Sequence, residues 1–199
     1  MRQRGGPVND MTRSRLALVA YGVAALFAVR LPSFYFLPQS SGSLLVRELS
    51  ALLGIAPHLL LFAVVAALPA PVWAKSAGYG WLAIDMTTDI MALNGVAPAT
   101  FLPMRYGGHI AAALWIATAS WEAKGATRGV GLLLALDLGV YSFIAPFVSF
   151  VALLPSIVLL PAWFVLVARH IGRGAEERQE AADRPSPTRS AHMTAEAII

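Results

Sequence analysis

The chain has 199 residues, of which 57% are hydrophobic and 13% charged, with a net charge of +4 and a mean hydropathy of +0.65. Soluble domains carry about 25% charged residues, so this composition excludes an ordinary soluble domain and predicts an integral membrane protein. The chain contains no cysteine, which excludes disulfides, thiolate metal sites and iron–sulfur clusters. Its basic residues lie mainly in tails and short loops, so the expected partner is the lipid bilayer and not nucleic acid.

In chain order, the apolar segments predict an all-α integral membrane protein with six transmembrane helices and short loops. Residues 1–15 form a basic cytoplasmic tail, residues 16–171 the transmembrane domain, and residues 172–199 a disordered cytoplasmic tail. A span needs about 20 apolar residues. The expected spans are 16–37, 44–68, 76–96, 98–121 and two helices within 129–168 that are joined by a turn around 146–150.

The distribution of basic residues predicts the orientation. Of the 15 Lys and Arg residues, 12 fall at one end of the six spans and 3 at the other. Positive residues concentrate on the cytoplasmic side, so both termini are expected in the cytoplasm. The chain also uses 13 Arg and 2 Lys, together with many Ala, which is typical of a GC-rich bacterial genome. We therefore expect a multi-pass protein of the bacterial inner membrane.

Ionisable residues interrupt the predicted spans. A charge near the bilayer centre costs about 3 kcal/mol, so such a residue usually faces the protein interior and has a partner. Asp85 and Asp89 are four residues apart and share one helix face, and the same holds for Arg105 and His109. If the intervening turn is centred on Ala97, then Asp89 lies opposite Arg105, and Asp85 lies opposite His109.

Two further hairpins extend this pattern. The connection between the second and third spans places His58 opposite Asp85, and the following cytoplasmic loop places Asp137 one turn from His109. No buried Lys or Arg at this depth neutralises both acids, so at least one of Asp85 and Asp137 is expected to be protonated. The predicted buried polar cluster consists of His58, Asp85, Asp89, Arg105, His109 and Asp137.

Three more charged residues lie at the outer ends of the first two spans. Arg30, Arg47 and Glu48 are expected to snorkel to the membrane surface and to form one interfacial pair. The alternative is an outer vestibule that attracts an anionic ligand.

These observations leave three kinds of function open. The first is a transporter-like protein that handles protons or ions through the buried Asp and His residues. The second is a non-catalytic accessory subunit of a larger membrane complex, or a homo-oligomer, in which the polar cluster only holds helices together. The third is a redox or metal protein, with haem b between His58 and His109 or a metal ion bound by the His and Asp residues. No enzyme motif is present, so neither catalysis nor a cofactor is the leading expectation.

Overall fold

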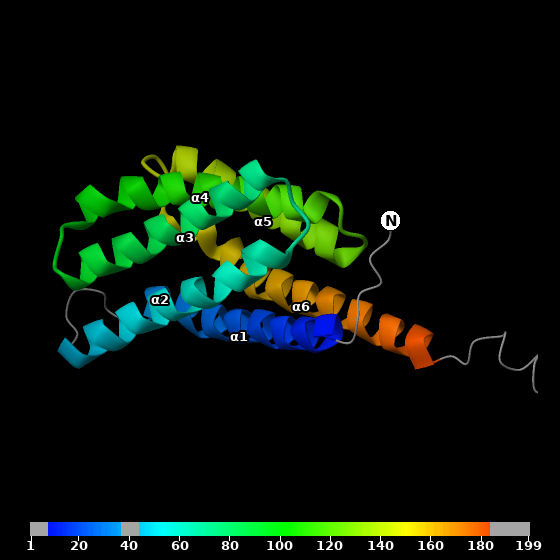
Figure 1. Ribbon diagram of the computed structural model, residues 1–199. Helices are drawn as coiled ribbons and strands as arrows, with labels where there is room; N and C mark the ends of the chain where they lie inside the picture. Colours follow the sequence, from blue (N-terminus) through cyan, green and yellow to red (C-terminus); the bar gives the residue numbers. More distant parts are fainter. Residues whose placement is uncertain (1–7, 37–43, 184–199) are drawn as a thin grey trace, which may run out of the picture.

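The computed structural model describes residues 8–36 and 44–183, and it is all-helical over these residues (Figure 1). Its elements follow one another as α1 (Val8–Phe36), α2 (Leu44–Ala67), α3 (Val72–Leu93), α4 (Pro98–Trp121), α5 (Ala126–Ile144), the short 3-10 helix η1 (Phe150–Leu153) and α6 (Leu154–Asp183). The described residues therefore contain six α-helices, as the apolar segments predict.

Four of the helices contain segments that are long and apolar enough to cross a membrane. These segments are Thr12–Ser33, Glu48–Ala67, Ala126–Ile144 and Val151–Arg173, which belong to α1, α2, α5 and α6. Large apolar side chains on these helices are exposed, among them Leu18 (69%), Phe143 (70%) and Val158 (69%). Extended apolar surface of this kind marks a face that contacts lipid or another protein. The helices α3 and α4, which carry Asp85, Asp89, Arg105 and His109, are not among these four.

The six helices form a closed ring. Each helix packs on its neighbours in the sequence, and α6 packs on α1. Figure 1 shows α6 beside α1, although the two helices come from opposite ends of the described chain. Aromatic rings fill the centre of this arrangement, with successive centroids 4.9 to 6.0 Å apart. The aromatic circuit runs through Phe27, His58, Trp81, Trp115, Trp163 and Phe164, and back to Phe27.

A short turn joins α3 to α4 and sets the register of this hairpin. The backbone of Gly95 has a φ of +75°, a conformation that favours glycine, and Pro98 begins α4, where its missing N–H needs no partner. Since α3 ends at Leu93 and α4 begins at Pro98, the centre of the turn falls between Gly95 and Val96. The expected centre at Ala97 is therefore displaced by more than one residue.

Both ends of the expected transmembrane domain extend further as helix. The helix α6 continues to Asp183, into the tail expected to be disordered, and α1 begins at Val8 instead of residue 16. Arg, Glu, Gln and Ala are strong helix formers, so the polar segment after residue 172 continues the helix. The expected loop at 39–43, the first seven residues and residues 184–199 lie outside the described part of the chain.

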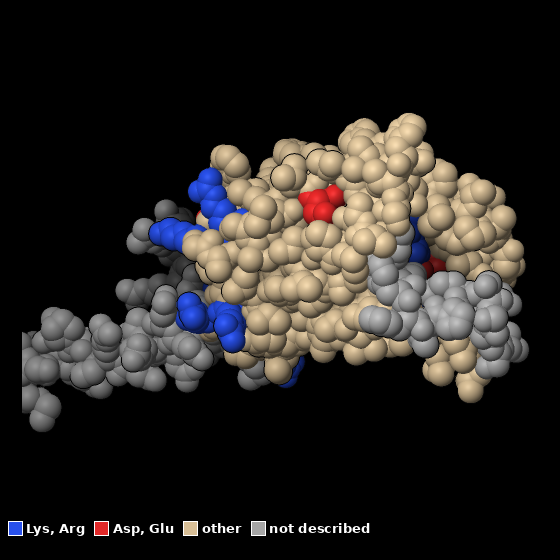
Figure 2. Space-filling view, turned by 180° about the vertical axis from the view of Figure 1, so that it is seen from behind, with Lys and Arg blue, Asp and Glu red and all other residues tan. Residues whose placement is uncertain are grey.

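Charge is distributed unevenly over the surface. Figure 2 shows Lys and Arg side chains gathered mainly at one end of the molecule, while most of the visible face is uncharged. Exposed basic residues include Arg15 of α1, Lys124 in the loop before α5, Arg128 of α5 and Arg169 of α6. The guanidinium of Arg128 also stacks over the Trp121 ring, 4.7 Å from its centroid.

Candidate functional site

Asp89 of α3 is held by two arginines from two other helices. The Arg105 guanidinium of α4 donates a hydrogen bond to Asp89 Oδ1, and Arg30 Nη2 of α1 lies 3.6 Å from the same oxygen. The side chains of Arg30 and Asp89 are 7% and 5% exposed. This ion-paired centre ties α1, α3 and α4 together, and neutralised pairs are what a membrane interior tolerates.

Arg105 is anchored further along α3. Its Nε donates to the Thr88 hydroxyl at 2.8 Å, and its Nη2 lies 3.3 Å from the backbone carbonyl of Asp85. The Thr88 hydroxyl in turn donates to that same carbonyl at 2.9 Å. The guanidinium therefore bridges two turns of α3, so α3 and α4 are locked in register at this level.

Arg30 lies elsewhere than the sequence suggests. It is buried instead of reaching the membrane surface, and its Nη1 donates to Ser50 Oγ of α2 at 2.8 Å. The expectation of a snorkelling arginine is wrong because Ser50 and Asp89 provide polar partners inside the helix ring. Glu48 is exposed near the start of α2, and Arg47 belongs to α2 with a side chain outside the described part.

Asp85 lies one turn deeper along α3 and contacts an imidazole. Its Oδ2 is 3.2 Å from His58 Nε2 of α2 and accepts a hydrogen bond from Trp81 Nε1 at 2.7 Å. Trp81 precedes Asp85 by four residues, so both side chains share one helix face. His58 is 5% exposed and Asp85 6% exposed, so this contact is shielded from solvent.

The hydrogen bonds of His58 determine where its protons are. His58 Nδ1 lies 2.6 Å from the Gly54 carbonyl, which only accepts, so Nδ1 must carry a proton. Its Nε2 faces an oxygen of Asp85, and a hydrogen bond there requires a second proton, on Nε2 or on the carboxyl group. The pair therefore holds one proton more than a neutral imidazole with a carboxylate. We call these two residues the His58–Asp85 dyad.

The second imidazole, that of His109, approaches Asp85 from α4. The two residues lie close enough to interact electrostatically, and Arg105, one helical turn from His109, reaches the same stretch of α3. No hydrogen bond joins Asp85 to His109 among the described residues. Asp85 Oδ1 and His109 Nδ1 are both buried, and neither has a hydrogen-bond partner within the described part of the chain.

Asp137 is separate from this cluster. Its Oδ2 accepts a hydrogen bond from Ser156 Oγ, which links α5 to α6, and the carboxyl group is half-buried. Of the six predicted cluster residues, the structure therefore brings together His58, Asp85, Asp89, Arg105 and His109. It adds Arg30 to them and places Asp137 at a different helix pair.

This arrangement changes the expected charge balance. The two buried arginines and the Asp89 carboxylate together leave one positive charge. The His58–Asp85 dyad is neutral overall while its extra proton is present, and it becomes an anion when that proton leaves. With His109 neutral, the cluster thus carries one positive charge in the loaded form and none afterwards.

Two observations concern residues that could ligate a metal or haem. Within the described ranges, no three His, Asp or Glu side chains are grouped so that they could hold a metal ion. Both ring nitrogens of His58 contact oxygen atoms, namely the Gly54 carbonyl and Asp85 Oδ2.

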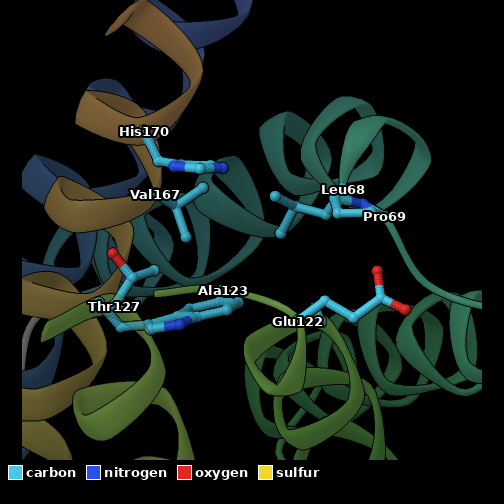
Figure 3. A pocket seen from close by; sticks show the side chains of 9 residues that line it. Leu68, Pro69, Glu122, Ala123, Thr127, Val167 and His170 are labelled. Carbon is cyan, nitrogen blue, oxygen red and sulfur yellow. The ribbon is translucent and has the colours of Figure 1, made fainter. Parts of the chain in front are cut away.

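A small pocket lies at the end of the molecule where the loops after α2 and α4 meet α6. Its volume is about 40 Å³, enough for a few water molecules. Figure 3 shows His170 and Glu122 approaching it from different sides. Trp163 lines the pocket and packs on Trp115, whose ring contacts Trp81, so aromatic rings lie between this pocket and the Asp85 carboxylate.

Two contributors to the site carry only weak signals in the sequence. The Ser50 hydroxyl accepts a hydrogen bond from Arg30, and the Gly54 carbonyl accepts one from His58 and so orients the imidazole. These two small residues and His58 follow one another at intervals of four, so they occupy one face of α2. A spacing of small residues at four predicts close helix packing, which is the signal that points to this face.

Comparison of the chain with protein-family models, curated proteins and solved structures gives no match. The positions and contacts of the polar residues are therefore the basis for the proposed function.

Proposed function

We propose that this protein is a transporter-like membrane protein that moves protons by means of Asp85. The observation that carries the proposal is the extra proton of the His58–Asp85 dyad, which is held inside a helix ring with an apolar outer surface. Protonatable acids beside imidazoles within a membrane typically form proton relays. The net positive charge of the loaded cluster favours release of this proton, because release leaves a neutral interior.

In this proposal all six helices cross the membrane, with both termini in the cytoplasm of a bacterial cell. Two observations support the arrangement: α3 and α4 complete the closed ring, and basic side chains gather at one end of the molecule. Reporter fusions after residues 43, 96 and 147 should then lie outside the cell, and fusions after 73, 125 and 175 inside. A reporter at residue 175 that is found outside would contradict the topology.

An accessory subunit without transport activity is the second candidate. The Asp89 centre supports it, since both arginines there are engaged by hydrogen bonds or ion pairs and connect three helices. Such contacts hold helices together without any proton transfer. Asp137, bonded to Ser156, fits the same role.

Proton flux into liposomes separates the two candidates. The purified protein is reconstituted with a pH-sensitive dye inside the vesicles, and a pH gradient is imposed together with a potassium–valinomycin potential. Wild-type protein should acidify the vesicles, and Asp85→Asn should abolish the flux while the protein remains folded, because the amide cannot carry the proton.

Asp137→Asn is the matched control, since it makes the same chemical change in a helix that does not contact the dyad. It should retain most of the flux. Wild-type vesicles without flux above empty liposomes, or full flux in Asp85→Asn, would overturn the proposal and leave the accessory subunit as the better explanation.

A further inference from the structure

Three buried side-chain atoms have no hydrogen-bond partner among the described residues: Asp85 Oδ1, His109 Nδ1 and Trp115 Nε1. The first two belong to residues of α3 and α4 that interact electrostatically, and Oδ1 is the Asp85 oxygen that the dyad does not use. A buried polar atom without a partner is costly in free energy, so such atoms usually bind another group. A carboxylate oxygen and an imidazole nitrogen on neighbouring helices indicate a shared ligand.

The described residues contain no direct hydrogen bond between Asp85 Oδ1 and His109 Nδ1. With the turn centred between Gly95 and Val96, His109 lies about three residues deeper than the position opposite Asp85, which is an axial offset of about 4.5 Å between the two helix positions. A water molecule that bonds to both atoms would join the two residues without a direct contact.

Glycine at position 108 allows α3 to approach α4 closely beside His109. A Cβ at Gly108 would lie 3.3 Å from Asp85 Oδ1 and 3.0 Å from Ile84 Cγ2. The absence of a side chain there lets the Asp85 carboxyl group lie against the α4 backbone beside His109.

We propose that one water molecule binds between Asp85 Oδ1 and His109 Nδ1 and makes His109 the second station of the proton path. This inference rests on the proposed proton function and specifies its route. Charged and titratable groups lie near Asp85 on five helices. They are Arg30 of α1, His58 of α2, Asp89 of α3, Arg105, Tyr106 and His109 of α4, and Tyr141 of α5, which packs on Tyr106. The nearest described contacts from α6 are the aromatic rings of Trp163 and Phe164.

The proposed path moves one proton from His58 to His109 through the Asp85 carboxyl group and the water. The proton between His58 Nε2 and Asp85 Oδ2 moves fully onto the carboxyl group, which leaves His58 neutral with its Nδ1 proton on the Gly54 carbonyl. Rotation of the carboxyl group exchanges its two oxygens and presents the O–H to the water. The water accepts this proton and gives one of its own to His109 Nδ1, so the carboxylate is restored and one proton has moved between the two imidazoles.

Nitrogen NMR of the histidines tests the link without relying on transport. The chain contains four histidines, and the signals of ¹⁵N-histidine-labelled protein in detergent are assigned with His58→Gln and His109→Gln. Asp85→Asn should displace the pH midpoint of the His109 signal, since a nearby carboxylate favours the charged imidazole. Water-to-imidazole magnetisation transfer at His109 should be present in the wild type.

Gly108→Ala and Gly107→Ala form the matched pair. The first places a methyl group beside Asp85 Oδ1 and should remove the water signal at His109, whereas a Cβ at Gly107 meets nothing within 4 Å and should leave it unchanged. An His109 signal that ignores Asp85→Asn, or a direct scalar coupling from His109 to the Asp85 carboxyl group, would overturn the inference. A linked His109 signal without liposome flux would instead refute only the proposed function.

Discussion

Gly54 is the position at which the backbone of α2 presses against the Asp89 carboxyl group. A Cβ built there would lie 2.8 Å from Asp89 Cγ and still closer to Oδ2. Asp89 cannot easily move aside, because Arg105 and Arg30 hold it from two other helices. Gly54→Ala must therefore displace α2 or loosen the ion-paired centre.

The expected size of the effect follows from two opposing terms. Overpacking a closed interior costs about 1–3 kcal/mol, and breaking a buried ion pair costs about 3–5 kcal/mol. Alanine in place of glycine in a helix returns about 1 kcal/mol. If Asp89 keeps its arginines, Gly54→Ala should lose up to about 2 kcal/mol of unfolding free energy, and more if it does not.

Thermal unfolding of the purified protein in detergent measures this difference. Gly80→Ala is the matched control, because a Cβ at Gly80 of α3 meets nothing within 4 Å. The control should be as stable as the wild type or more stable, whereas Gly54→Ala should unfold several degrees lower. Equal melting temperatures for the two variants would show that Asp89 is not packed against α2, and would refute the geometry of the centre.

Two further predictions use the same assay. Asp89→Asn should lower the melting temperature more than Arg105→Gln does. The first change leaves Arg30 and Arg105 without their shared carboxylate, whereas the second keeps the pair of Arg30 with Asp89. The reverse ranking would contradict the double pairing. Gly131→Ala should destabilise and Gly129→Ala should not, since a methyl group at 131 would collide with the hydrogen-bonded side chains that join α4 to α6, and a lack of difference would contradict that contact.

The sequence predicts the helices well because the residues within each segment determine where its helix begins and ends. Apolar runs of about 20 residues, separated by Pro, Gly and charged residues, locate all six helices, and the four that are apolar enough to span a membrane lie where they are expected. The continuation of α6 to Asp183 was missed, because a polar segment with high helix propensity resembles a solvated tail by composition.

Contacts between helices are harder to predict. Arg105 reaches Asp89 in spite of the displaced turn, since its long side chain spans the error, whereas the shorter Asp85 and His109 do not meet directly. The sequence does not predict the contact of Arg30 with Asp89, because hairpin arithmetic relates only helices that follow each other, whereas α1 and α3 do not. The same arithmetic compares Asp137 with His109 of the preceding helix, but the partner of Asp137 is Ser156, an uncharged residue of the following helix.

The cluster divides into two parts that differ in how completely their polar atoms are bound. Around Asp89, guanidinium groups, a hydroxyl and a carboxylate bind one another, and an interior of this kind holds one conformation. Around Asp85, one oxygen is bound twice while the other has no partner in the described chain, and a neighbouring imidazole shares that condition. Trp115 Nε1 is also buried without a partner, but of these three atoms only those of Asp85 and His109 belong to groups that can take up a proton. Their position beside a dyad that must hold a proton is therefore the strongest reason to expect proton transfer at Asp85, with the Asp89 centre as the rigid frame that keeps the helices in register.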